Sequence, residues 1–190
     1  MTSQPGPRSS HERTFRSRAA SMGLAVWDVS PEGTLRSQPC AADHGPVLSA
    51  WLESSTVRRA VAGAVQAWRA DDTSHAPPSV PEPIRIFNDG WLLAVPRSDR
   101  NRFQGWFAVL ATGPGLLTDP FAHAASVEVR VELQELYRAM KPVAIYTQAG
   151  VHALAHSLRW MWEDLSHTQS QRHDIDGLTL HLTDSYETMD

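Results

Sequence analysis

Cysteine is almost absent from this chain of 190 residues, in which Cys40 is the single thiol. One thiol can form neither a disulfide framework within the chain nor a thiolate metal site. The neighbouring Pro39, Ala41 and Asp43 offer no cation to stabilise a thiolate, so the sequence favours an inert loop thiol over a redox sensor. Cysteine usage therefore predicts a reducing, cytoplasmic location.

Long apolar runs are missing as well. No stretch approaches the roughly 18 apolar residues that a membrane span needs, and the N-terminus lacks the apolar core of a secretion signal. The net charge of −4 does not indicate the clustered cations that bind nucleic-acid phosphates. The sequence thus predicts neither a membrane nor a nucleic acid as a partner.

Signatures of catalysis are also lacking. No serine lies in a nucleophile elbow, and Gly113-Pro114-Gly115 is not followed by the lysine of a phosphate-binding loop. We therefore expect no catalytic residue, no bound metal and no cofactor.

Two histidines support an alternative from another functional class. His152 and His156 are four residues apart on an expected helix, a spacing at which two imidazoles can share one metal. Ala153 follows His152, so the glutamate base of a zinc-protease motif is missing. A metal-dependent hydrolase would need Glu163 or Asp164 as a third ligand, and two ordinary surface histidines are the favoured interpretation.

The most informative stretch present runs from residue 84 to 111. Two apolar runs flank Asn88-Asp89-Gly90, and a third run follows a polar loop over 96–102. Asp-Gly between apolar runs predicts a tight hairpin, because glycine accepts a positive φ. Three adjacent antiparallel strands are therefore expected. The residues that we expect to line or rim a ligand pocket on this sheet are Trp91, Arg102, Phe103 and Trp106.

The arginines of the same loop allow two interpretations. Arg97, Arg100 and Arg102 could hold a carboxylate or phosphate through paired hydrogen bonds. A solvated basic loop explains them equally simply and is favoured.

The remaining elements follow from local patterns. Residues 1–21 contain four arginines and few apolar residues, which predicts a flexible basic tail. Leu24 to Trp27 and Thr34-Leu35 are expected as two strands around a turn.

Two regions are expected to be helical. Apolar spacing over 46–70 predicts either one helix or two that break near Ser54-Ser55. Thr118 or Asp119 is expected to cap a helix that continues to Met140, although Val127–Val131 also alternates as a strand would.

Residues 147–190 carry a second organised pattern. Apolar residues recur there at alternating steps of four and three, the spacing of a coiled coil. Gly177 weakens such a helix by roughly 1 kcal/mol relative to alanine, so a partner helix would stabilise it. The residues expected at a homodimer interface are Leu154, Leu158, Met161, Leu165, Ile175, Leu182 and Tyr186.

The order of these elements resembles GAF and PAS-like sensor domains of bacterial signalling proteins. The resemblance rests on the opening GLAVWDVSPEGTL, the hairpin WLLAVPRSDRNRFQGWFAVLA and the tail LTLHLTDSYETMD, which is similar to a helix leading to an output module. It implies a sensor domain over 22–145 and a dimerising signalling helix over 146–190. It also implies a small-molecule ligand, a homodimer and an output domain C-terminal to the chain.

Together these patterns predict an α+β fold in which helices flank a central antiparallel sheet, followed by a long coiled-coil-type helix. The expected function is a non-catalytic sensory or regulatory domain that couples ligand or partner binding to a dimeric helix. A purely structural dimerisation module is a further alternative.

Overall fold

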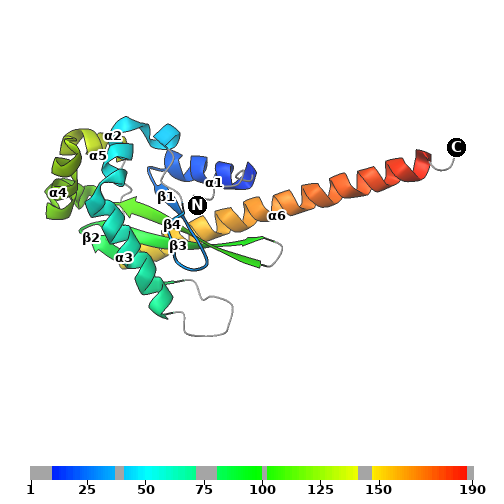
Figure 1. Cartoon of the computed structure of the whole chain (residues 1–190), viewed down its shortest axis with the longest axis horizontal. Helices are drawn as coiled ribbons and strands as arrows, with labels where there is room; N and C mark the ends of the chain where they lie inside the picture. The colour runs from blue at the N-terminus through cyan, green and yellow to red at the C-terminus, as the bar shows by residue number, and fades with distance from the viewer. Residues whose placement is uncertain (1–9, 37–40, 72–80, 100–101, 141–146, 188–190) are drawn as a thin grey trace, which may run out of the picture.

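A four-stranded antiparallel sheet forms the centre of the fold, in the order β1-β4-β3-β2. The computed structural model describes residues 10–36, 41–71, 81–99, 102–140 and 147–187 (Figure 1). Strands β2 (Ile84–Phe87), β3 (Gly90–Asp99) and β4 (Arg102–Thr112) form the predicted meander. Strand β1 (Ala25–Val29) pairs with β4 at the other edge. The predicted α+β class is confirmed, while the strand expected at Thr34-Leu35 is reduced to one bridge between Leu35 and Val29.

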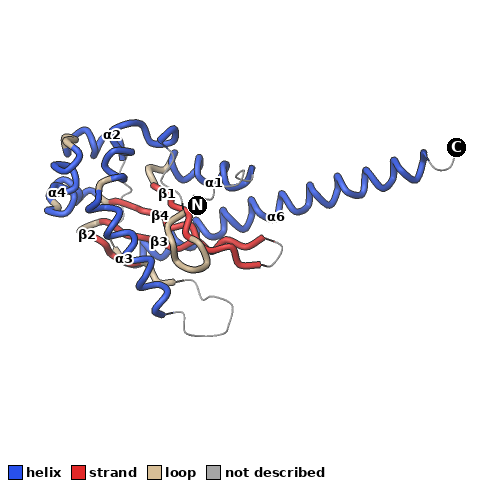
Figure 2. The backbone as a smooth tube through the Cα atoms, in the orientation of Figure 1, coloured by secondary structure: helices blue, strands red, loops and turns tan. Residues whose placement is uncertain are grey.

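Helices cover both faces of the sheet, as Figures 1 and 2 show. One face packs against α2 (Ala41–Glu53), α3 (Ser55–Asp71), α4 (Pro120–Val129) and α5 (Leu133–Met140). The other face packs against α1 (Ser10–Ser21) and α6 (Gln148–Glu187). Because both faces are covered, residues 92–95 of β3 are all buried and form an unbroken apolar run.

The β2–β3 hairpin turn is anchored by the segment that follows β4. The turn places its positive φ at Asp89 (φ 48°), whereas the sequence predicted it at Gly90. The side-chain Oδ2 of Asp89 accepts a hydrogen bond from the Gly115 backbone N–H at 2.9 Å, in the 3-10 helix η1 (Pro114–Thr118). Gly90 is required for another reason, since a Cβ there would lie 2.1 Å from the Phe87 ring.

The sequence left one helix or two open over 46–70, and the structure has two, which break at Ser54. Ser54 ends α2 and caps α3, because its hydroxyl accepts a hydrogen bond from the Val57 N–H at 3.2 Å. Glu128 of α4 adds a second cap, accepting from the N–H groups of Ser55 at 2.6 Å and Thr56 at 3.2 Å. These hydrogen bonds, led by the one from the Ser55 backbone, lower the pKa of Glu128 to about 2.

The prediction of a single helix from 118 to 140 is wrong. Of the two expected caps, Thr118 and Asp119, it is Asp119 that caps α4, its carboxylate accepting from the N–H of Phe121 at 2.7 Å. The helix ends at Arg130, whose left-handed backbone (φ 56°, ψ 42°) forms a C-cap. The chain then turns and α5 starts at Leu133.

The prediction of a flexible tail is wrong for residues 10–21, which form α1; residues 1–9 lie outside the described part. The buried side chains of α1 are Phe15, Arg16 and Ala19. Phe15 and Ala19 are four apart and share one helix face, so both can pack on the sheet. None of the described helices is both long and apolar enough to cross a membrane.

Candidate functional site

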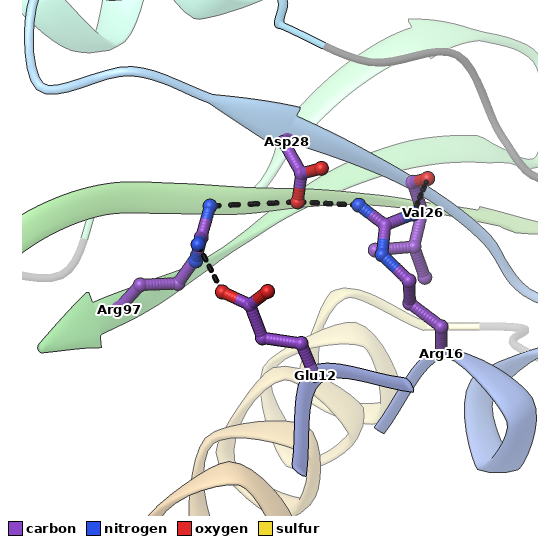
Figure 3. A network of polar contacts seen from close by, with 5 residues as sticks. All are labelled: Glu12, Arg16, Val26, Asp28 and Arg97. Atoms are coloured by element: carbon purple, nitrogen blue, oxygen red, sulfur yellow. Dashed lines mark hydrogen bonds and ion pairs between the residues drawn. The ribbon is translucent and has the colours of Figure 1, made fainter. Parts of the chain in front are cut away.

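A cluster of charges and aromatic rings lies where α1, the sheet and α6 meet. Strand alternation creates its floor: Trp27 and Val29 of β1 face the α2–α3 side, so Asp28 points to the α1 side with Val26. Arg97 on β3 shares that side with Leu93 and Val95. Figure 3 shows Asp28 between two arginines that come from different elements.

Four charged side chains form a continuous chain of ion pairs. Asp28 Oδ1 pairs with Arg16 of α1 and lies 3.4 Å from Nη1 of Arg97. Arg97 also pairs with Glu12 of α1. Arg16 donates a further hydrogen bond from Nη1 to the Val26 carbonyl oxygen at 2.8 Å. The order is Glu12–Arg97–Asp28–Arg16, and we call this set the charge chain.

The charge chain is largely shielded from water. The exposed fractions of its side chains are 4% for Arg16, 14% for Asp28, 16% for Arg97 and 15% for Glu12. Two positive and two negative charges cancel, which is the condition for burying them at acceptable cost. Removing one charge would leave a partner uncompensated in a low-dielectric surrounding.

Aromatic rings from three elements lie against the charge chain. The guanidinium carbons of Arg16 and Arg97 lie 5.6 and 4.8 Å from the centroid of the Phe107 ring on β4. Phe15 of α1 stacks on Phe107 at 4.7 Å. Trp162 of α6 meets Phe107 edge-on at 4.9 Å and Phe15 at 5.7 Å. These rings therefore connect the N-terminal helix, the sheet and the C-terminal helix.

The residues predicted to line one ligand pocket lie on opposite faces of the sheet. Trp106 and Phe103 pack with the α2–α3 core, whereas Trp91 packs on the α1–α6 side. A β-bulge explains the pairing of the first two: Arg97 pairs with Gly105 but Ser98 pairs with Phe103, so one residue of β4 is extra. The Phe103 and Trp106 rings then meet at 4.6 Å. The side chain of Arg102 lies outside the described residues.

The prediction of one shared pocket is therefore wrong for Trp91. Its ring lies instead beneath Arg85 of the neighbouring strand, with the guanidinium carbon 5.9 Å from the ring centroid.

The solvated-loop interpretation is wrong for Arg97, which binds carboxylates of its own chain. Arg100 lies outside the described residues.

The two candidate metal-binding histidines are exposed on α6. His152 Nε2 lies 3.5 Å from Glu82 Oε2, the only ion pair described for it. Within the described ranges, no group of three or more His, Cys, Asp or Glu side chains is placed to hold a metal ion. The described side chains therefore do not assemble the site that a hydrolase using His152 and His156 would need.

The predicted dimer stripe divides into two parts. Leu158 is 1% exposed and packs on the sheet of its own chain, so its assignment to a dimer interface is wrong. Leu154, Met161 and Leu165 are half-buried against the same cluster. Ile175, Leu182 and Tyr186 have side chains outside the described part, and their role in a dimer stays a prediction.

Sequence reasoning missed most of the cluster. The sequence patterns predict a tail at Glu12 and Arg16 and a turn at Asp28, and the heptad spacing selects Met161 instead of its neighbour Trp162. A usable signal existed for Trp162: Val151, Leu158 and Trp162 recur at the seven- and four-residue steps of one helix face. The charge chain had no comparable local signal.

The chain matches no family model, and no curated protein or solved structure is significantly similar to it.

Proposed function

We propose that this chain is a non-catalytic sensory or regulatory domain of a bacterial signalling protein, GAF- or PAS-like in character, which couples ligand or partner binding to a dimeric signalling helix. The observation that carries the proposal is the two-part placement of α6. Its first half packs on the sheet, and the rest extends well beyond the body of the domain (Figures 1 and 2). A helix of 40 residues is about 60 Å long.

The composition of the distal half of α6 supports a second copy as its partner. Isolated helices are marginally stable in water, and most helical stability in proteins comes from packing of an apolar face. The heptad positions of the packed half continue past the body to Ile175, Leu182 and Tyr186. A second α6 in parallel register would cover this stripe and bring two output domains together.

The mechanism requires that the sheet-packed half of α6 has two arrangements. A ligand or partner changes the helix pair only if it binds one arrangement more tightly than the other. The contacts of Leu158 and Trp162 with the sheet give α6 a defined position that such binding would shift. A small rotation of the sheet-packed half of α6 would be transmitted along the helix to the proposed output domain.

A matched pair of leucines tests the dimer. Leu182 occupies a core position of the predicted heptad, while Leu180 lies at an outward position of the same helix turn. We expect Leu182→Asp to raise the dimer dissociation constant at least tenfold in analytical ultracentrifugation, and Leu180→Asp to leave it unchanged. A wild-type chain that sediments as a monomer at high micromolar concentration contradicts the proposal.

A dimerisation module without a ligand is the second candidate. It is favoured by the separation of Trp91 from Trp106 on opposite sheet faces, which divides the expected pocket. A thermal-shift screen of nucleotides, small acids and amino acids distinguishes the two. Stabilisation by one compound class supports a sensor, and a dimer that no compound stabilises supports the structural module.

A further inference from the structure

We propose that α1 is a releasable strap, which holds the sheet-packed half of α6 in place and is itself held by the charge chain. This inference rests on the proposed function for its consequence, the control of the α6 pair. The strap itself is a property of one chain.

The first argument is the small apolar contribution of α1. Phe15 and Ala19 are its only fully buried apolar side chains. The face that contacts the sheet also carries Glu12 and Arg16, which reach Arg97 and Asp28. A short helix with two apolar contacts docks weakly by packing alone, so the charge chain decides whether α1 stays on the sheet.

The second argument is that both sides keep a charge partner when α1 leaves. On the sheet side, Asp28 and Arg97 already contact each other at 3.4 Å. On the helix side, Glu12 and Arg16 are four residues apart with the acid first, the favoured order for a pair within one helix. When α1 is released, each of the four charged side chains therefore keeps a partner of opposite charge. This makes the docking of α1 reversible.

The third argument links the strap to α6. Trp162 is 4% exposed, and two of the rings that cover it belong to α1: Phe15 at 5.7 Å and His11 at 4.9 Å. Leu165 is the last described side chain of α6 that packs on the sheet cluster, so Trp162 lies close to the end of the anchored half. Displacement of α1 uncovers Trp162 and shortens the part of α6 that is held.

Hydrogen exchange of the full chain tests this inference. The variant Glu12→Gln with Arg16→Gln removes both charges that α1 contributes and leaves Asp28 with Arg97. We expect amides of α1 and of residues 158–165 to exchange at least tenfold faster than in the wild type and to remain less protected than those of β3 and β4, which open only when the whole domain unfolds. Phe15→Ala, which removes the apolar contact instead, should give the same local pattern.

The control changes charges on the same helix away from the sheet. Arg13 and Arg18 are exposed on α1, and the variant Arg13→Gln with Arg18→Gln should exchange as the wild type does. The strap is refuted if α1 keeps its exchange rate in the Glu12/Arg16 variant, if α1 is released without any change in 158–165, if amides of α1 are as strongly protected as those of β3 and β4, or if the control variant behaves like the Glu12/Arg16 variant. Hydrogen exchange of α1 does not require a dimer. If Leu182→Asp does not weaken the dimer, the proposed function is contradicted, but the strap is not.

Discussion

Phe15 and Trp162 meet edge to face at 5.7 Å, with an interplanar angle of 81°, and join the first described helix of the chain to the last. Both rings also contact Phe107 in the centre of the sheet. Residues separated by most of the chain thus share one apolar cluster, and the stability of that cluster is open to direct measurement.

Truncation of the Trp162 side chain should strongly reduce the stability of the domain. Removing a buried aromatic side chain costs about 3–5 kcal/mol, because the transfer free energy is lost and a cavity is left. We expect Trp162→Ala to lower the free energy of unfolding by that amount in urea denaturation. Trp160, on the same helix but 67% exposed, is the matched control, and Trp160→Ala should change stability by less than about 0.5 kcal/mol. Equal effects at the two positions would contradict the described packing.

Asp28 should be the most sensitive member of the charge chain. The isosteric change Asp28→Asn removes the charge that Arg16 and Arg97 share, and breaking a buried pair in this way costs about 3–5 kcal/mol. Glu163→Gln provides the comparison, since its pair with Arg159 is solvent-exposed and worth about 0.2–1 kcal/mol. Denaturation midpoints that shift equally in both variants would show that the charge chain is hydrated.

Gly105 should not tolerate a side chain. Its φ is 112°, and a Cβ there would lie 2.0 Å from the Val29 carbonyl oxygen, between β4 and β1. We expect Gly105→Ala to destabilise the domain by more than about 1 kcal/mol. Gly63 in α3 has open space around it, so Gly63→Ala should instead stabilise the helix by up to about 1 kcal/mol. Thermal melts of the two variants should move in opposite directions.

Glu128 should make the stability of the domain depend on pH in the acidic range. Hydrogen bonds from Ser55 and Thr56 lower its pKa in the folded state from the ordinary value of 4.5 to about 2. A lowered folded-state pKa contributes stability that is present above pH 4.5 and is lost as the pH falls towards 2. The stability difference between wild type and Glu128→Gln should therefore be constant near neutral pH and shrink over that interval. A difference that is the same at pH 2.5 and pH 6 would rule out the cap.

Local chemistry made part of this fold predictable. The three strands from 84 to 112, the helix break near Ser54 and the cap at Asp119 each depend on residues within a few positions of one another. Turn preference, side-chain period and capping act over such distances, so one sequence suffices to recognise them. The break at Arg130 was missed because a left-handed C-cap usually carries glycine.

The candidate site depended on contacts that no local pattern contains. The hydrogen bond from Arg97 to Glu12 joins residues 85 apart, and the one to Asp28 joins residues 69 apart. A single bulge decided which face Phe103 occupies, and the packing of both sheet faces decided that Arg16 is buried. The sequence by itself determined the strands and helices, because propensity is local. Only the tertiary structure decided which charges meet, because the burial of an arginine depends on a carboxylate brought from elsewhere in the chain.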